Sequence, residues 1–222
     1  MVRPLSTHPR GCRTGNCPRE LLQLLELLMN DHTSGDRLPP LPSATWTDAQ
    51  RVCAEEIING PRGELVEPFI PLLRSPELCT HVQRTGEYLR YRSAIGLRLS
   101  ELAILVTACH WRQQVEWAIH APIAMREGIS TAAVEALAAG RRPNYERADE
   151  ALVHDFTQES LRDRRVTDTT WTAAREVLGE QGVVDLLGIV GYYTMLSIVM
   201  NGAQTPPPLN RPMRLQAPPA AA

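Results

Sequence analysis

The chain has 222 residues, enough for one domain with a substantial core, and its 43% hydrophobic and 22% charged residues are ordinary for a globular protein. The net charge of −2 provides no global field to attract nucleic acid or an anionic membrane, and 5% aromatic residues argue against base-stacking surfaces. We therefore expect neither nucleic acid nor a membrane as a partner.

The N-terminal region is predicted to be a tail, a helix and a loop. Residues 1–17 have no apolar pattern, and we expect a flexible tail. Pro18, at a first helical position, begins a Leu-rich helix at 19–29. Residues 31–43 contain a glycine and three prolines, which predict a loop.

Three helices are predicted next. Thr47 and Gln50 have the spacing of a capping box, which indicates a helix from there to about residue 59. Residues 64–73 and 76–92 show helical apolar patterns and predict two more helices.

The middle of the chain has the strongest helical patterns. Residues 97–108 predict a strongly apolar helix capped by Ser100, and residues 115–127 predict the next one, which ends before a glycine. Ser130 is the predicted N-cap of a further helix to residue 139.

The last predicted helices differ in character from the segment after them. Residues 146–162 and 170–178 are amphipathic, whereas residues 183–200 are apolar on all sides. The segment 204–222 contains six prolines and predicts a Pro-rich tail that is either disordered or laid along a neighbouring subunit. With no convincing strand pair, we expect an all-α, single-domain bundle of eight or nine helices over residues 18–203.

The apolar segment 183–200 is close to the minimum length of a membrane span. Asp185 would be costly in hydrocarbon, and no basic cluster flanks either end. We predict a buried helix, which needs apolar partners on every side; some of these could come from another subunit.

The cysteines indicate a reducing compartment, because an odd, scattered set does not form a disulfide framework. They are Cys12, Cys17, Cys53, Cys79 and Cys109. The first residues contain no apolar stretch of the kind found in secretory signals, so we expect a cytoplasmic protein. Cys12 and Cys17 have no second Cys/His pair at metal spacing, and we expect no metal site.

Glu116 and His120 are the most informative pair in the sequence. Their four-residue spacing places both side chains on one helix face, as a possible acid–base pair. On one straight helix, Glu101 would lie about 22 Å from Glu116. A shared site therefore requires the chain to reverse near residues 109–112, where no glycine or proline marks a break. Spacing alone therefore favours an ordinary helix-surface role for these residues.

An ordered set of motifs over residues 50–202 resembles the carboxymuconolactone decarboxylase family of the alkylhydroperoxidase-D-like superfamily. The motifs are Gly60-Pro-Arg-Gly63, Pro76-Glu-Leu78, Gly86-Glu-Tyr-Leu-Arg90, Arg98-Leu-Ser-Glu101, Glu116-Trp-Ala-Ile-His120 and Gly188-Ile-Val-Gly-Tyr-Tyr193. The resemblance implies an all-α fold in which the Glu101 helix reverses into the Glu116/His120 helix. It also implies a homo-oligomer, a trimer or hexamer, with sites near subunit contacts.

The peroxidase branch of this superfamily has a Cys-x-x-Cys pair between its Glu and its His. Counted from Glu101, those two positions are Gln113 and Glu116, so both thiols are missing. Cys109 lies one helical turn from the first position and has no partner at that spacing. Thiol-dependent peroxide reduction is therefore disfavoured.

The decarboxylase branch is similar in retaining Glu116 and His120. This similarity implies a carboxy-lyase-type enzyme without cofactor, performing decarboxylation or related proton transfer on a small carboxylated lactone or enolisable compound. His120 would donate the proton. Glu116 would orient the His120 imidazole and raise its pKa, and Glu101 would be a second carboxylate. Candidate substrate-binding residues are His110, Trp111, Gln113 and Trp117. The alternatives are a peroxidase of the same superfamily, or a non-catalytic helical oligomer or small-molecule-binding module.

Overall fold

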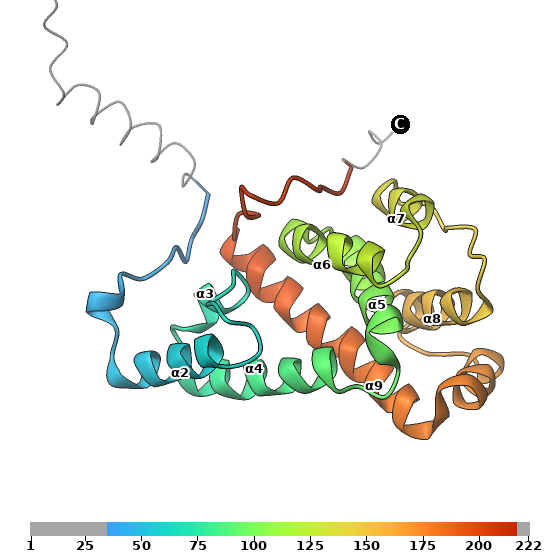
Figure 1. Ribbon diagram of the computed structural model, residues 1–222, viewed down its shortest axis with the longest axis horizontal. Coiled ribbons are helices and arrows are strands. Elements are labelled where there is room, and N and C mark those ends of the chain that lie inside the picture. The colour runs from blue at the N-terminus through green and yellow to red at the C-terminus, as the bar shows by residue number, and fades with distance from the viewer. Residues whose placement is uncertain (1–34, 217–222) are drawn as a thin grey trace, which may run out of the picture. The chain divides into compact units, whose positions relative to one another are not determined.

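The computed structural model describes residues 35–216. These residues form eight α-helices and two short helical turns, without any strand, which confirms the all-α prediction for this part of the chain (Figure 1). The predicted tail at 1–17 and the predicted helix at 19–29 lie outside the described residues.

The first described helices confirm one helix start and correct another. After the turn η1 (Ser43–Thr45), α2 (Asp48–Asn59) begins with the predicted capping box, in which Thr47 and Gln50 each accept a hydrogen bond from the other's backbone N–H. The predicted helix at 64–73 is reduced to α3 (Phe69–Leu72). Pro68 is the reason, because a proline disfavours helical geometry in the residue before it.

Helices α4 (Pro76–Tyr91) and α5 (Gly96–Trp111) follow, and α5 lies in the centre of the core. Residues 99–108 of α5 are all buried, since α6, α8 and α9 pack around it. The predicted cap at Ser100 is wrong. The helix begins at Gly96, and the Ser100 hydroxyl donates to the Gly96 carbonyl inside the first turn.

Helix α6 (Gln114–Arg126) runs back along α5 and is followed by α7 (Thr131–Ala138). Ser130 caps α7 as predicted, accepting a hydrogen bond from the Ala133 N–H. The predicted helix at 146–162 is α8 (Ala148–Gln158) continued by η2 (Glu159–Asp163), a single turn of π-helix.

The last helix, α9 (Asp168–Ala203), joins the two predicted helices at 170–178 and 183–200. Gly179 interrupts its helical geometry with φ 70° and ψ 172°, which a glycine adopts without strain. By length and composition α9 could cross a membrane, but the core helix of a soluble protein has the same properties. Here α9 packs against α3, α4, α5 and α8, and Leu186 and Ile189 are fully buried.

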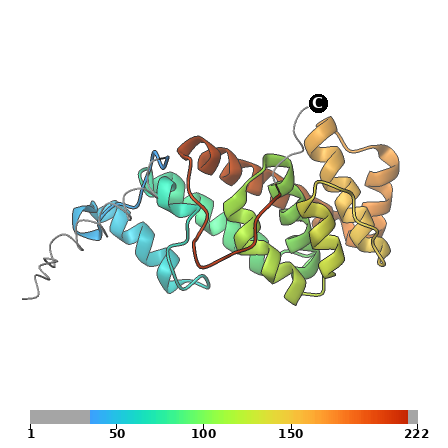
Figure 2. The ribbon, with the colours of Figure 1, turned by 90° about the horizontal axis from the view of Figure 1, so that it is seen from above.

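The described part of the segment after α9, residues 204–216, packs against its own chain, whereas we expected disorder or a neighbouring subunit. Figure 2 shows this red segment passing back across the green helices α5 and α6. Leu215 is buried, and its backbone N–H and C=O both bond to the side chain of Gln114 on α6. This pairing fixes the end of the described chain against the core.

Candidate active site

The chain reverses between α5 and α6 within the predicted region. Arg112 adopts the left-handed conformation at the end of α5, with φ 54° and ψ 32°, and the Gln113 side chain caps α6 by accepting from the Val115 N–H. The Gln113 amide also donates to Asn201 of α9, which in turn donates to the Trp111 carbonyl. These side-chain bonds stabilise a reversal that contains no glycine or proline.

The reversal brings Glu101, Glu116 and His120 together. The Nδ1 atom of His120 lies 2.7 Å from Oε2 of Glu101, and its Nε2 atom lies 3.3 Å from Oε2 of Glu116. All three side chains are buried, with at most 3% of any one exposed. The imidazole therefore lies between two carboxylates, out of contact with bulk water.

This arrangement favours the charged form of His120. Burial lowers the pKa of His120, but the attraction and hydrogen bond of Glu101, joined by those of Glu116, outweigh burial and raise it above its ordinary value. A neutral imidazole would direct a lone pair at one carboxylate, whereas the imidazolium donates from both nitrogens. The raised pKa of His120 therefore favours its role as a proton donor.

Each carboxylate retains one buried oxygen without a partner among the described residues, namely Oε1 of Glu101 and Oε1 of Glu116. A buried, unpartnered acceptor is costly, so a donor group on a ligand would be stabilising at Glu116, which lines the cavity described next. The Tyr193 ring of α9 meets the His120 ring edge-on, with centroids 5.2 Å apart, and helps to fix the imidazole plane.

A cavity of about 320 Å³ opens beside this cluster, within the size range of small-molecule sites. His120 and Glu116 line it, whereas Glu101 lies behind His120 and does not. Apolar and aromatic side chains form much of the wall, including Phe69 and Tyr192. Four arginines also line it: Arg62, Arg90, Arg126 and Arg211. The cavity therefore combines a proton donor with a cationic wall.

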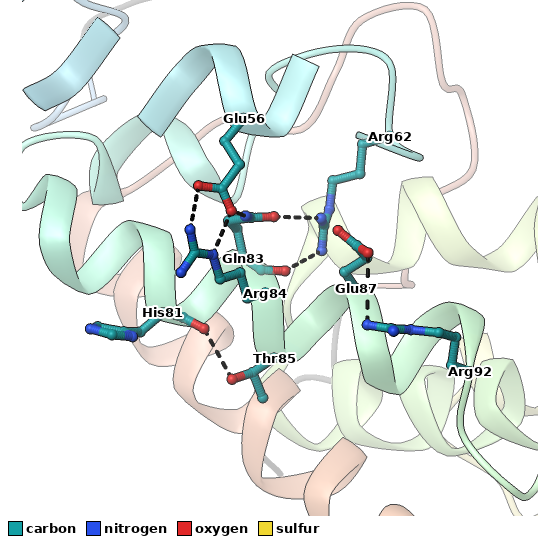
Figure 3. A network of polar contacts seen from close by, with 8 residues as sticks. All are labelled: Glu56, Arg62, His81, Gln83, Arg84, Thr85, Glu87 and Arg92. Atoms are coloured by element: carbon teal, nitrogen blue, oxygen red, sulfur yellow. Dashed lines mark hydrogen bonds and ion pairs between the residues drawn. The ribbon is translucent and has the colours of Figure 1, made fainter. Parts of the chain in front are cut away.

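One of these arginines is held firmly in place. Both terminal nitrogens of Arg62 donate to Gln83 of α4, at 3.2 Å to its side-chain oxygen and 3.1 Å to its carbonyl (Figure 3). The Gln83 amide donates to Glu56, which also forms an ion pair with Arg84. The Arg62 guanidinium also lies 4.8 Å from the centre of the Phe69 ring. This network orients a fixed positive charge at the cavity wall.

No protein-family model and no curated protein matches this sequence. The geometry of the chain itself must therefore support any functional assignment.

The four predicted substrate-binding residues do not line this cavity. His110 is exposed and lines a second cavity of about 490 Å³, together with Cys109 and His154. Because α5 carries His110 and α6 carries His120, the chain reversal separates them, although they would share a stripe on one straight helix.

The other three have structural contacts. Gln113 caps α6, and the Trp111 indole donates to Thr194 of α9 at 3.1 Å. Trp117 is 1% exposed and packs in the hydrophobic core. The positions of these four residues have one explanation: the sequence placed them near the acid–base pair but did not show which face of each helix meets the core.

Sequence reasoning missed the cationic wall. Arg62 and Arg90 belong to motifs that carry the family resemblance, but neither was singled out as a ligand. Arg211 lies in the Pro-rich segment, whose composition gives no indication that it meets the cavity. Tyr192 and Tyr193 also line the cavity, in addition to packing in the core.

Proposed function

We propose that this protein is a cofactor-free acid–base enzyme of the carboxymuconolactone-decarboxylase type, acting on a small carboxylated lactone or enolisable compound. The observation that carries the proposal is the buried Glu101–His120–Glu116 cluster at the wall of an arginine-lined cavity. The cluster supplies a proton, and the arginines favour an anionic substrate.

The proposed reaction begins with the loss of CO₂ from a carboxylated, unsaturated lactone. The electron pair of the broken C–C bond moves into the conjugated lactone carbonyl and forms an enolate. His120 then donates its Nε2 proton to carbon, since this nitrogen lies beside Glu116, which lines the cavity, while Nδ1 stays bonded to Glu101, which does not. Glu101 positions the ring, and the neutral imidazole regains a proton from water.

The cavity wall supports this chemistry in two ways. Arginine guanidinium groups bind carboxylates and stabilise negative charge that develops on the lactone oxygen. The apolar and aromatic lining exclude water, which strengthens these electrostatic interactions.

The thiol peroxidase alternative receives less support from the geometry. Among the described residues, no cysteine lines this cavity. Cys109 lines the second cavity, where burial raises the pKa of its thiol to about 12, so little thiolate is present at neutral pH. The other alternative, a binding module without catalysis, differs from our proposal only in turnover.

The proposal includes a homo-oligomer, a trimer or hexamer. Its support is the exposed apolar face of α9, where Val184 is 63% and Ile198 is 53% exposed. The molar mass in solution, measured by light scattering, tests this part.

The test of function is a panel of carboxylated lactones and dienoates incubated with the wild type and with the His120→Gln variant. We expect the variant to be slower by about 10²-fold to 10⁴-fold, the usual contribution of a general acid. His81→Gln, which changes an exposed histidine on α4, is the matched control and should retain the wild-type rate.

Circular dichroism and thermal unfolding of each variant establish that the proteins compared are folded. Equal rates for folded His120→Gln and wild type on every substrate would exclude His120 from the mechanism. Binding without turnover of any compound would favour the non-catalytic alternative.

A further inference from the structure

The C-terminal segment 205–216, which we call the strap, is attached at its two ends. At its beginning, the Thr205 N–H donates to the Met200 carbonyl of α9 at 3.0 Å. At its end, Leu215 pairs with Gln114, and the Gln216 N–H donates to the Ala138 carbonyl of α7 at 3.2 Å. The strap thus links the end of α9 to α6 and α7.

Between these attachments, the strap contributes Arg211 to the cavity wall. The nearest acid to Arg211 is Glu64, 3.9 Å away, and these side chains are 33% and 67% exposed. An exposed ion pair of this length contributes little to stability. Arg211 can therefore exchange Glu64 for the carboxylate of a ligand at low cost.

Arg211 differs in this respect from Arg62 on the cavity wall. Arg62 already bonds to Gln83 through both terminal nitrogens, whereas the long Glu64 ion pair is the one polar interaction of the Arg211 side chain among the described residues. Arg62 is thus a fixed charge, and Arg211 is a charge that depends on the position of the strap.

We propose that the strap closes over the bound substrate, with Arg211 binding a substrate carboxylate and coupling its binding to strap closure. This inference rests on the proposed function for the identity of the site. A ligand can shift an opening equilibrium only through contacts made in one state, and the Arg211–carboxylate contact exists only when the strap is closed. Arg211 is therefore a specificity-determining residue for anionic substrates.

The composition of the strap suits such a movement. Pro206, Pro207, Pro208 and Pro212 restrict its backbone and reduce the conformational entropy that closing costs. Gln204, just before the strap, adopts the left-handed conformation with φ 58° and is the point where α9 ends. The strap can therefore move as a stiff segment about this residue when the Leu215 and Gln216 attachments release.

The first experiment measures binding of glutarate, a non-reactive dicarboxylate, by calorimetry. We expect Arg211→Gln to weaken binding about tenfold, the loss typical of one charged hydrogen bond. Arg165→Gln removes an exposed arginine distant in sequence from the strap and absent from the cavity lining, and should bind as the wild type does. Equal affinity of Arg211→Gln and wild type, or no binding by the wild type, would overturn the proposal.

The second experiment measures strap opening through trypsin cleavage between Arg214 and Leu215, followed by mass spectrometry. Leu215 is only 5% exposed, so cleavage requires the end of the strap to detach. Glutarate should slow this cleavage in the wild type and not in Arg211→Gln. The Arg211–Pro212 bond resists trypsin in any case, so the substitution removes no competing cut. Cleavage unaffected by glutarate in the wild type would refute the coupling.

The experiments can refute the proposed catalytic function and the proposed strap closure independently of each other. Glutarate binding through Arg211 without lactone turnover would retain the strap and reject the catalytic function. Lactone turnover with the same KM in Arg211→Gln and wild type would retain the function and reject the strap.

Discussion

Gly86 of α4 lies where the Tyr192 ring of α9 crosses the helix. A Cβ atom at this position would fall 2.0 Å from the Tyr192 hydroxyl oxygen and 2.3 Å from its Cζ atom. Tyr192 is only 6% exposed and also lines the candidate cavity. Gly86→Ala therefore forces the ring to move and changes both stability and the site.

The expected change in the free energy of unfolding is the difference between two effects of Gly86→Ala. Alanine is favoured over glycine inside a helix by about 1 kcal/mol. Overpacking a core typically costs about 1–3 kcal/mol, and complete loss of aromatic packing costs about 3–5 kcal/mol. Subtracting the helix gain leaves about 0–2 kcal/mol for overpacking and about 2–4 kcal/mol for lost aromatic packing. Because backbone on α4 and a ring on α9 both resist displacement, we expect a value between these limits, a reduction in the free energy of unfolding of roughly 1–3 kcal/mol.

Urea unfolding followed by circular dichroism measures this loss. Gly191→Ala on α9 is the matched control, because a Cβ there would have no atom within 4 Å. This control should be more stable than the wild type by about 0.5–1 kcal/mol, since only the helix propensity changes.

A double-mutant cycle with Tyr192→Ala tests the reasoning itself. Once the ring is removed, the added methyl group of Gly86→Ala should no longer be destabilising. If Gly86→Ala costs the same in both backgrounds, or if the single variant is as stable as the wild type, steric conflict with Tyr192 is not the cause.

Three further predictions follow from buried polar groups. The folded-state pKa of His120 is raised above its unfolded value of 6.5, so its contribution to stability is complete below pH 6.5 and is lost as pH rises through the folded-state pKa. In urea unfolding, the difference in free energy of unfolding between wild type and His120→Gln should therefore shrink above neutral pH. A difference that stays constant with pH would contradict this. Glu101→Gln removes the carboxylate that most raises the pKa of His120, so the alkaline fall of kcat should begin at lower pH, and an unchanged profile would exclude this role. Asp185→Ala removes the buried carboxylate that accepts hydrogen bonds from the Ala94 N–H and the Tyr88 hydroxyl, which should cost about 1–3 kcal/mol in urea unfolding; unchanged stability would contradict it.

The sequence was sufficient to predict the helical class and several helix starts, because these depend on local chemistry. The capping box at Thr47 and the cap at Ser130 satisfy backbone donors within their own first turns. The helix predicted at 64–73 was wrong because its apolar pattern received more weight than Pro68 and Pro71.

For the candidate site as well, the features that depend on local sequence could be predicted, and those that depend on distant segments could not. The convergence of Glu101, Glu116 and His120 was predictable once a reversal near residues 109–112 was assumed, and Arg112 provides it. The bonds that stabilise this reversal come from Asn201, which no local pattern connects to residue 113. The same is true of Arg62 and Arg211, whose place on the cavity wall depends on contacts between distant parts of the chain.

The close spacing of the acid–base cluster along the chain also has a consequence for folding. Glu101 and His120 are 19 positions apart within one helical hairpin, so their contact closes a short loop. Arg62, Tyr193 and Arg211 must approach from much farther along the chain to complete the cavity. Since short loops close faster and at lower entropic cost, the hairpin can assemble first. Its acid–base cluster, which is buried in the folded protein, then stays exposed to water until α9 docks. In that order of assembly, the cluster is desolvated only when α9 docks.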